Sequence, residues 1–132
     1  MNTDLIKLSF DSTFTGTMVS PTGTVKLGDQ NGGMQPYHLL YGALGSCFYA
    51  TFLNIATKKR LTFKNATLEI NGVKRDEIPP TLNEVTITLV INNPSDEIQF
   101  RKSAESGAKY CSIHETISKV ATIKLEVLFK YE

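Results

Sequence analysis

The residues with the most reactive side chains in this chain are its two cysteines, Cys47 and Cys111. A thiolate is a strong nucleophile, and two thiols that meet in a fold can form a reversible disulfide. Cys111 stands directly before Ser112-Ile113-His114-Glu115, which fits the S-x-x-E capping box at a helix start. Unpaired N–H groups at a helix N-terminus favour a thiolate, so the local sequence favours ionisation of Cys111. Cys47 has no such help and needs a nearby cation or hydrogen-bond donor to ionise.

The spacing of these residues gives no metal-binding pattern. Two cysteines without a C-x-x-C pair, and two scattered histidines, do not match a zinc site, so we expect no metal and no cofactor. In a reducing compartment the two thiols are either free or a reversible redox pair. The alternative for Cys47 is a structural role, because a thiol inside a helix often packs as a small buried hydrophobe.

Cys47 lies in the middle of a long apolar segment, residues 35–60. Pro36 suits the first turn of a helix, and the cations that end the segment suit its last turn. A helix that is apolar almost all round is buried on every side, in a protein core or in a membrane. About 22 uncharged residues are long enough to span a bilayer. The polar residues inside the segment and the amphipathic strands on both sides favour a buried central helix, and we expect no membrane partner.

Small residues surround Cys47 on this helix, including Gly42, Gly45 and Ser46. Each glycine inside a helix costs about 1 kcal/mol relative to alanine. We therefore expect that the middle of the helix is kept small so that another element can approach it closely.

The length and charge of the chain limit what it can be. With 132 residues it is long enough for a single domain, residues 1–132, with a sizeable core. A net charge of +1 and the lack of a basic stripe predict no nucleic-acid partner. The N-terminus has no charged region followed by an apolar run, so we expect no signal peptide and a cytoplasmic location.

The remaining elements follow from periodicity and turn residues. Residues 83–92 alternate, with Val85, Ile87, Leu89 and Ile91 on one face and threonines on the other. A second helix is expected from an Asn93 cap to a stop at Gly107. The expected order is βββ-α-ββ-αα-β, an α+β fold whose antiparallel sheets wrap one buried central helix. The strands are expected at residues 4–13, 14–20, 23–28, 61–75, 83–92 and 120–130.

Two motifs in this order resemble those of a known family. Pro36-Tyr-His-Leu-Leu-Tyr-Gly-Ala-Leu-Gly-Ser-Cys47 is similar to the Pro-Glu-x-Leu…Ala-x-Cys helix of the osmotically inducible protein C (OsmC) and organic hydroperoxide resistance (Ohr) superfamily. The second match is Ala108-Lys-Tyr-Cys111, followed by Ser112 where the family often has proline. The resemblance covers the whole chain in element order. It implies an intertwined homodimer in which the central helices pack together and two active sites lie at the subunit interface.

The resemblance also implies a thiol peroxidase mechanism in oxidative-stress defence. A Cys47 thiolate attacks an organic hydroperoxide and becomes a sulfenic acid. Cys111 then condenses with it to a disulfide, which an external dithiol reduces. This chemistry requires neither a metal nor a flavin.

The chain departs from the family at the groups that activate the thiolate. Peroxidase members use an arginine from the N-terminal strands and a glutamate after the helix-opening proline, but here no arginine precedes residue 60. Tyr37 stands where that glutamate would be, and on a straight helix it lies about 15 Å from Cys47. Lys26 is a candidate replacement for the arginine, and a solvated strand lysine is the alternative. His38 and His114 are candidate donors or cations near a thiol, and surface or helix-end roles are the alternatives.

Two other functions compete with peroxide reduction. The first is a dimeric protein that binds a small apolar ligand, with Phe48, Tyr49 and Phe52 lining a pocket for a fatty-acid-like or aromatic molecule. The second is a hotdog-type thioesterase, which also wraps a sheet around one long helix. The element order, the late cysteine and the lack of an acid on the central helix argue against the thioesterase.

Overall fold

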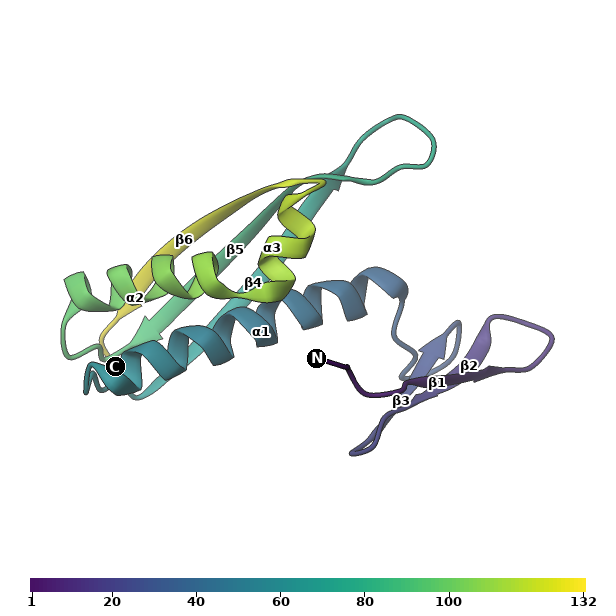
Figure 1. The fold of residues 1–132 in the computed structure, drawn as a ribbon, viewed down its shortest axis with the longest axis horizontal. Helices are drawn as coiled ribbons and strands as arrows, with labels where there is room; N and C mark the ends of the chain where they lie inside the picture. Colours follow the sequence, from purple (N-terminus) through teal and green to yellow (C-terminus); the bar gives the residue numbers. More distant parts are fainter. The chain divides into compact units, whose positions relative to one another are not determined.

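The computed structural model describes residues 1–132 and has the element order βββ-α-ββ-αα-β that the sequence predicts (Figure 1). The α+β class is therefore confirmed, with two three-stranded sheets and three helices. The chain divides into two compact units, Met1–Leu40 and Tyr41–Glu132. The first unit holds one sheet, and the second holds the other sheet and most of the helical residues.

The first unit is an antiparallel meander of β1 (Lys7–Phe10), β2 (Thr15–Val19) and β3 (Thr24–Gly28). This unit buries little apolar surface, because Leu27 is its only buried large hydrophobic residue. Other large hydrophobic residues of this unit are exposed, among them Leu8, Phe10, Phe14 and Met34. They surround an apolar cavity of about 180 Å³ lined by Leu8, Phe10, Phe14, Leu27, Met34, Pro36 and Leu39. An exposed apolar face of this kind is typical of a surface that takes part in an interaction.

Helix α1 (Pro36–Lys58) confirms the long helix predicted around Cys47. Its buried residues are spaced to form one face of the helix: Leu44, Gly45, Phe48, Phe52 and Ala56. The opposite face is exposed and consists mostly of small or polar residues: Ala43, Ser46, Ala50, Leu53, Asn54 and Thr57. The prediction of a helix buried on every side is therefore wrong within one chain, because one sheet and the helices beside it cover a single face. By length and composition alone α1 is also suited to cross a membrane, a property that core helices of water-soluble proteins share.

In the second unit, β4 (Asn65–Lys74) and β5 (Leu82–Asn92) form an antiparallel hairpin. The predicted inner face of β5 is confirmed, since Val85, Ile87, Leu89 and Ile91 are all fully buried. β6 (Thr122–Lys130) pairs with β5 in parallel, where the sequence predicted an antiparallel sheet. The reason is the connection: two helices between β5 and β6 carry the chain back to the starting end of β5, as a parallel pairing requires. Figure 1 shows these helices lying along β6.

Helix α2 (Glu97–Tyr110) starts later than predicted. Asp96 is its N-cap, and the Asp96 carboxylate accepts the Gln99 N–H at 3.0 Å. Asn93, the predicted cap, instead has a φ of 56° and exchanges hydrogen bonds with Glu132 at the end of the chain. The predicted cap therefore joins the start of the crossover connection to the C-terminus.

The other ends of these helices also differ from the prediction. Gly107 was expected to stop α2, but it lies inside the helix, where a Cβ would be 3.0 Å from the Cα and Cβ of Phe52. Glycine is present there because α2 and α1 cross at this point. Helix α3 (Ser112–Ser118) is capped by Cys111 and not by Ser112. The helix therefore begins on the sulfur-bearing residue itself.

The two close approaches of α1 predict opposite responses to alanine. Gly107→Ala gains about 1 kcal/mol of helix propensity, but its methyl group meets the Phe52 backbone, and overpacking costs about 1–3 kcal/mol. Gly45→Ala meets only the terminal Cδ1 of Ile70, at 2.7 Å, which can rotate away. We expect Gly107→Ala to lower the free energy of unfolding in urea by about 1 kcal/mol and Gly45→Ala to leave it unchanged or raise it. Equal stability of Gly107→Ala and wild type would show that α1 and α2 are packed less closely than described.

Candidate active site

The fold brings the two cysteines together, although they are far apart in the sequence. Cys47 lies at the middle of α1 and is half-buried, whereas Cys111 lies at the junction of α2 and α3 and is only 1% exposed. Both are free thiols, and their side chains are hydrogen-bonded to each other. Two thiols in direct contact, one reachable from solvent and one covered, form a candidate redox pair.

The start of α3 supplies hydrogen-bond donors to both sulfur atoms. The N–H of His114 donates to Cys111 Sγ at 3.3 Å, which makes the Cys111 side chain the N-cap. The N–H groups of Ser112 and Ile113 and the hydroxyl of Ser112 interact with the Cys47 sulfur. Donors at a helix N-terminus stabilise negative charge on sulfur.

These contacts shift the pKa of Cys47 downward. Burial raises the pKa of the Cys47 thiol, but the hydrogen bonds with Cys111, Ile113 and Ser112 together lower it by more. The pKa of Cys47 therefore lies below that of an ordinary thiol. The sequence left open which group could favour a thiolate in the middle of a helix, and the structure identifies the first turn of α3.

Cys111 responds in the opposite direction. Burial raises the pKa of the Cys111 thiol, and its hydrogen bond with Cys47 raises it further, against a smaller lowering by the His114 N–H. The prediction that the α3 N-terminus favours a thiolate on Cys111 is therefore wrong. The N–H groups of His114 and Ile113 do lower the pKa of Cys111, but burial and the hydrogen bond with Cys47 raise it by more.

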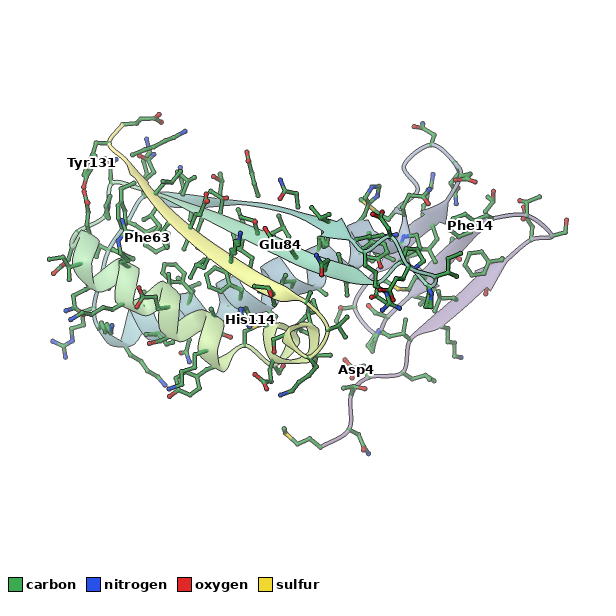
Figure 2. All side chains as sticks on the ribbon, turned by 90° about the horizontal axis from the view of Figure 1, so that it is seen from above. Asp4, Phe14, Phe63, Glu84, His114 and Tyr131 are labelled. Atoms are coloured by element: carbon green, nitrogen blue, oxygen red, sulfur yellow. The ribbon has the colours of Figure 1, made fainter.

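The other predicted candidates fall into two groups. Lys26, Tyr37 and His38 belong to the first compact unit, where Lys26 is an exposed lysine of β3. His38 has the helix-end role that was its alternative, because its Nδ1 accepts the N–H of Gln35 at 3.0 Å. His114 lies on α3 (Figure 2), and burial lowers its pKa despite the nearby Glu115 carboxylate. Its imidazole is therefore neutral at pH 7, and its contribution to the thiol pair is its backbone N–H.

Sequence reasoning missed Ser112 and Ile113 as members of the site. The available signal was their position in the first turn of a helix that starts directly after a cysteine. What could not be seen is that this turn faces Cys47, since that depends on how α3 packs against α1.

Neither cysteine lines the two pockets described in the second unit. A groove of about 470 Å³ is lined by Tyr41, Gly42, Gly45, Ser46, Tyr49, Leu68 and Ile70. Phe48 and Phe52, expected to line a ligand pocket, are instead fully buried, and Phe52 packs against the rings of Phe63 and Phe100. The prediction for Phe48 and Phe52 is therefore wrong, because this face of α1 forms the core.

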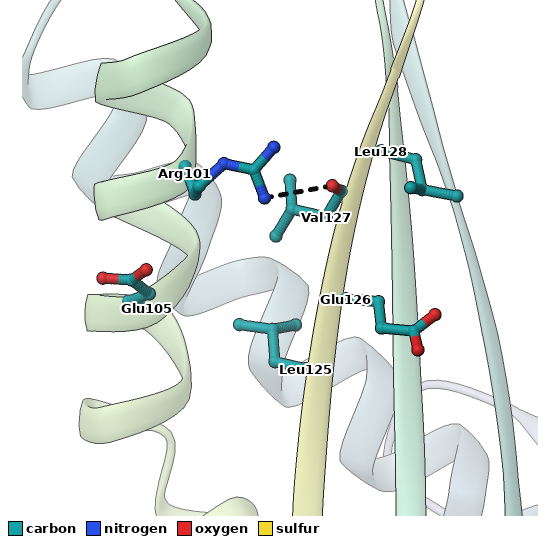
Figure 3. A pocket seen from close by; sticks show the side chains of 6 residues that line it. All are labelled: Arg101, Glu105, Leu125, Glu126, Val127 and Leu128. Atoms are coloured by element: carbon teal, nitrogen blue, oxygen red, sulfur yellow. Dashed lines mark hydrogen bonds between the residues drawn. The ribbon is translucent and has the colours of Figure 1, made fainter.

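A second pocket, of about 380 Å³, lies between α2 and β6 (Figure 3). Its Arg101 donates to the carbonyl of Val127 at 3.2 Å and lies over the ring of Phe129 at 5.2 Å. This arginine therefore binds the edge strand of the sheet, and no cysteine lines the pocket.

Comparison with known proteins identifies a family for this chain. The OsmC-like protein family model matches residues 28–126. This chain belongs to the OsmC-like family. A hydroperoxide reductase of Mycoplasma pneumoniae is 25% identical over 100 residues, which cover 72% of this chain and 70% of that protein. The resemblance drawn from the two cysteine motifs is thus confirmed at the level of the family.

Solved structures of other proteins share this fold. A hypothetical protein from Aquifex aeolicus VF5 has a TM-score of 0.90 at 24% identity and covers 100% of this chain and 99% of its own. An OsmC-like protein from Mycoplasma pneumoniae has a TM-score of 0.86 at 20% identity and covers 98% of both chains. The OsmC-like chain described here therefore has the architecture of the family over its whole length.

The opposite pKa shifts predict selective labelling of the two thiols. In the reduced protein at pH 7, we expect iodoacetamide to label Cys47 before Cys111, because Cys47 is more exposed and its pKa is lowered. Labelling of Cys47 should fall only when the pH drops through this lowered pKa and protonates the thiolate. A time course of peptide mass spectrometry at several pH values measures both effects. Faster labelling of Cys111 would contradict the assignment.

Proposed function

We propose that this protein reduces organic hydroperoxides, with Cys47 as the peroxide-reactive thiol and Cys111 as the thiol that resolves it. The observation that carries the proposal is the pair itself: two free, hydrogen-bonded thiols with pKa values shifted in opposite directions. Groups whose environments move their pKa values apart commonly divide the roles of a reaction. The relative from Mycoplasma pneumoniae, named hydroperoxide reductase, supports the choice of substrate class.

In the first step the Cys47 thiolate attacks the distal oxygen of the hydroperoxide. A sulfur–oxygen bond forms as the oxygen–oxygen bond breaks, and the alkoxide leaves and takes a proton from solvent. The sulfur loses two electrons and becomes a sulfenic acid, while the peroxide is reduced to an alcohol. A half-buried thiolate suits this step, because the peroxide must reach the sulfur.

In the second step the Cys111 sulfur attacks the Cys47 sulfenic acid. A disulfide forms, and the departing hydroxide takes the Cys111 proton and leaves as water. The raised pKa of Cys111 keeps that proton on the thiol until it is needed, and burial shields the thiol from direct oxidation. An external dithiol then reduces the disulfide by exchange, which fits the reducing cytoplasm expected from the sequence.

We further propose that the protein acts as an intertwined homodimer. Two observations support it: the exposed face of small residues on α1 and the open apolar face of the N-terminal sheet. Small side chains let two helices approach closely, and an exposed apolar face is typical of an interaction surface. We infer that a second copy of the same chain covers both faces.

Counting thiols tests the proposed reaction directly. We expect the reduced protein to lose two thiols per chain within seconds of adding one equivalent of cumene hydroperoxide, and to regain both with a dithiol. A redox-inactive alcohol, cumyl alcohol, is the matched control and should consume none. Survival of both thiols for minutes would refute the proposal.

A further inference from the structure

Strand β6 lies at an edge of its sheet, because the strand order is β4-β5-β6. One side of β6 pairs with β5 along its whole length, and the other side has no strand beside it. A free edge presents a row of backbone N–H and C=O groups to which another strand can bind. The free edge of β6 is therefore a surface on which a further strand could add to the sheet.

The backbone groups of alternate β6 residues face this free edge. The Val127 carbonyl accepts a hydrogen bond from Arg101 on α2, so it points away from β5. The Lys130 carbonyl accepts the N–H of Asn93 at 2.8 Å, so it points to the β5 side. Successive residues of a paired strand direct their backbone groups to opposite sides. The edge-facing residues are thus the odd-numbered ones: Ile123, Leu125, Val127 and Phe129.

The free edge of β6 is complementary to the same edge of a second copy. In an antiparallel pair with its two-fold axis at Leu125, Ile123 of one copy lies opposite Val127 of the other. This register sets edge-facing residues against edge-facing residues, as an antiparallel ladder requires. It also sets Lys124 of each copy opposite Glu126 of the other, and both side chains are exposed. Opposite charges directly across two strands stabilise the pairing.

The side chain of Arg101 already occupies this edge (Figure 3). It donates to the Val127 carbonyl at 3.2 Å, and its guanidinium carbon lies 5.2 Å from the centre of the Phe129 ring. A hydrogen bond from a charged donor is stronger than one from the neutral amide of an incoming strand. A charged side chain at a sheet edge is also a common means by which proteins prevent the addition of strands.

We propose that Arg101 is a guard residue that keeps the free edge of β6 closed to β6 of a second copy. Without this side chain, two copies join edge to edge into one sheet with the strand order β4-β5-β6-β6-β5-β4. The surface is one that neither cysteine lines, so the proposal does not depend on peroxide reduction. It is also distinct from the proposed homodimer, which uses α1 and the N-terminal sheet.

The test compares Arg101→Ala, Arg101→Met and Lys102→Ala in the full-length protein. Methionine keeps an apolar stem over Phe129 but has no donor for the Val127 carbonyl. Lys102 is the matched control, because it is the next residue of α2 and also an exposed cation. Sedimentation velocity over a range of concentrations measures association, and circular dichroism shows whether each variant is folded.

We expect both Arg101 variants to form a species of twice the wild-type mass, with an association constant higher than that of wild type by roughly tenfold or more. Lys102→Ala should sediment as wild type does. If Arg101→Ala fails to fold, Arg101→Met decides the test, since it keeps most of the packing. A folded Arg101→Met variant that sediments as wild type at every concentration would overturn the proposal.

Charge reversal tests the register of the pairing. Lys124→Glu, added to Arg101→Met, places a glutamate opposite Glu126 of the second copy and should abolish the new association. Adding Glu126→Lys as well restores opposite charges and should restore it. Lys124 also pairs with Glu84 at 3.0 Å, so Lys124→Glu alone is the control for loss of that ion pair. Association that is insensitive to Lys124→Glu would refute the pairing about Leu125.

Amide hydrogen exchange, followed residue by residue by NMR, distinguishes strand pairing from unspecific aggregation. In wild type, the edge-facing N–H groups of Leu125 and Val127 should exchange faster than those of Glu126 and Leu128, which face β5. In Arg101→Met, the Leu125 and Val127 amides should become protected as the concentration rises. Slow exchange of both edge-facing amides in wild type would overturn the proposal, because the edge would then already be bound.

Discussion

Cys47→Ser should abolish peroxide reduction, lowering its rate by roughly 10³-fold or more, because the serine hydroxyl stays protonated where the thiol ionises. Cys111→Ser should behave differently. Its Cys47 still reacts with one equivalent of peroxide, but the cycle stops at the sulfenic acid because the resolving thiol is gone. Consumption of one equivalent of cumene hydroperoxide in the absence of added dithiol, and trapping of the sulfenic acid with dimedone, distinguish the two variants.

The roles are tested by where the trapped adduct appears. In Cys111→Ser the dimedone adduct should lie on Cys47, and wild type should show almost none because the disulfide forms first. Cys47→Ala serves as a second control, since it removes the nucleophile without adding a hydroxyl. Equal peroxide consumption by wild type and Cys47→Ser, or an adduct on Cys111 in Cys47→Ser at the wild-type rate, would reverse or eliminate the assigned roles.

Much of the fold follows from the local sequence. Alternating residues placed the inner face of β5, and Pro36 with the terminal cations placed α1 to within two residues. The direction of β6 did not follow, because the alternation of a strand is the same whether its neighbour is parallel or antiparallel. The buried face of α1 did not follow either, since an almost uniformly apolar helix carries no sign of which face one chain can cover.

In the candidate site, too, the residues could be predicted from the sequence but their contacts could not. The sequence identified both cysteines and the helix start after Cys111, and the structure brings all three together. It assigned the donors of that helix to Cys111 alone, because the contact with Cys47 depends on packing and not on adjacency in the chain. The His114 N–H donates to Cys111 Sγ, and the first turn of the same helix also lowers the pKa of Cys47. Which thiol ionises is decided by the packing of α3 against α1.

Ala50→Glu should separate the two copies of the proposed homodimer. Ala50 lies on the exposed face of α1, so in the single chain a glutamate there stays in water and should leave folding intact. If two α1 helices pack on this face, the same glutamate places an unpaired charge at the interface, which typically costs several kcal/mol. We expect the dissociation constant of the dimer to rise by about a hundredfold or more, measured by sedimentation velocity over a range of concentrations.

The control for this experiment is Lys102→Glu, which places a glutamate on the exposed surface of α2. It should leave the wild-type sedimentation coefficient unchanged. A monomeric wild type would refute the homodimer, and a dimeric Ala50→Glu variant would show that α1 does not form the interface. Because Cys47 lies on the same helix, the labelling rate of Cys47 in the dissociated variant also reports whether the second copy shields the reactive thiol. A faster rate in the monomer is expected if the partner covers it.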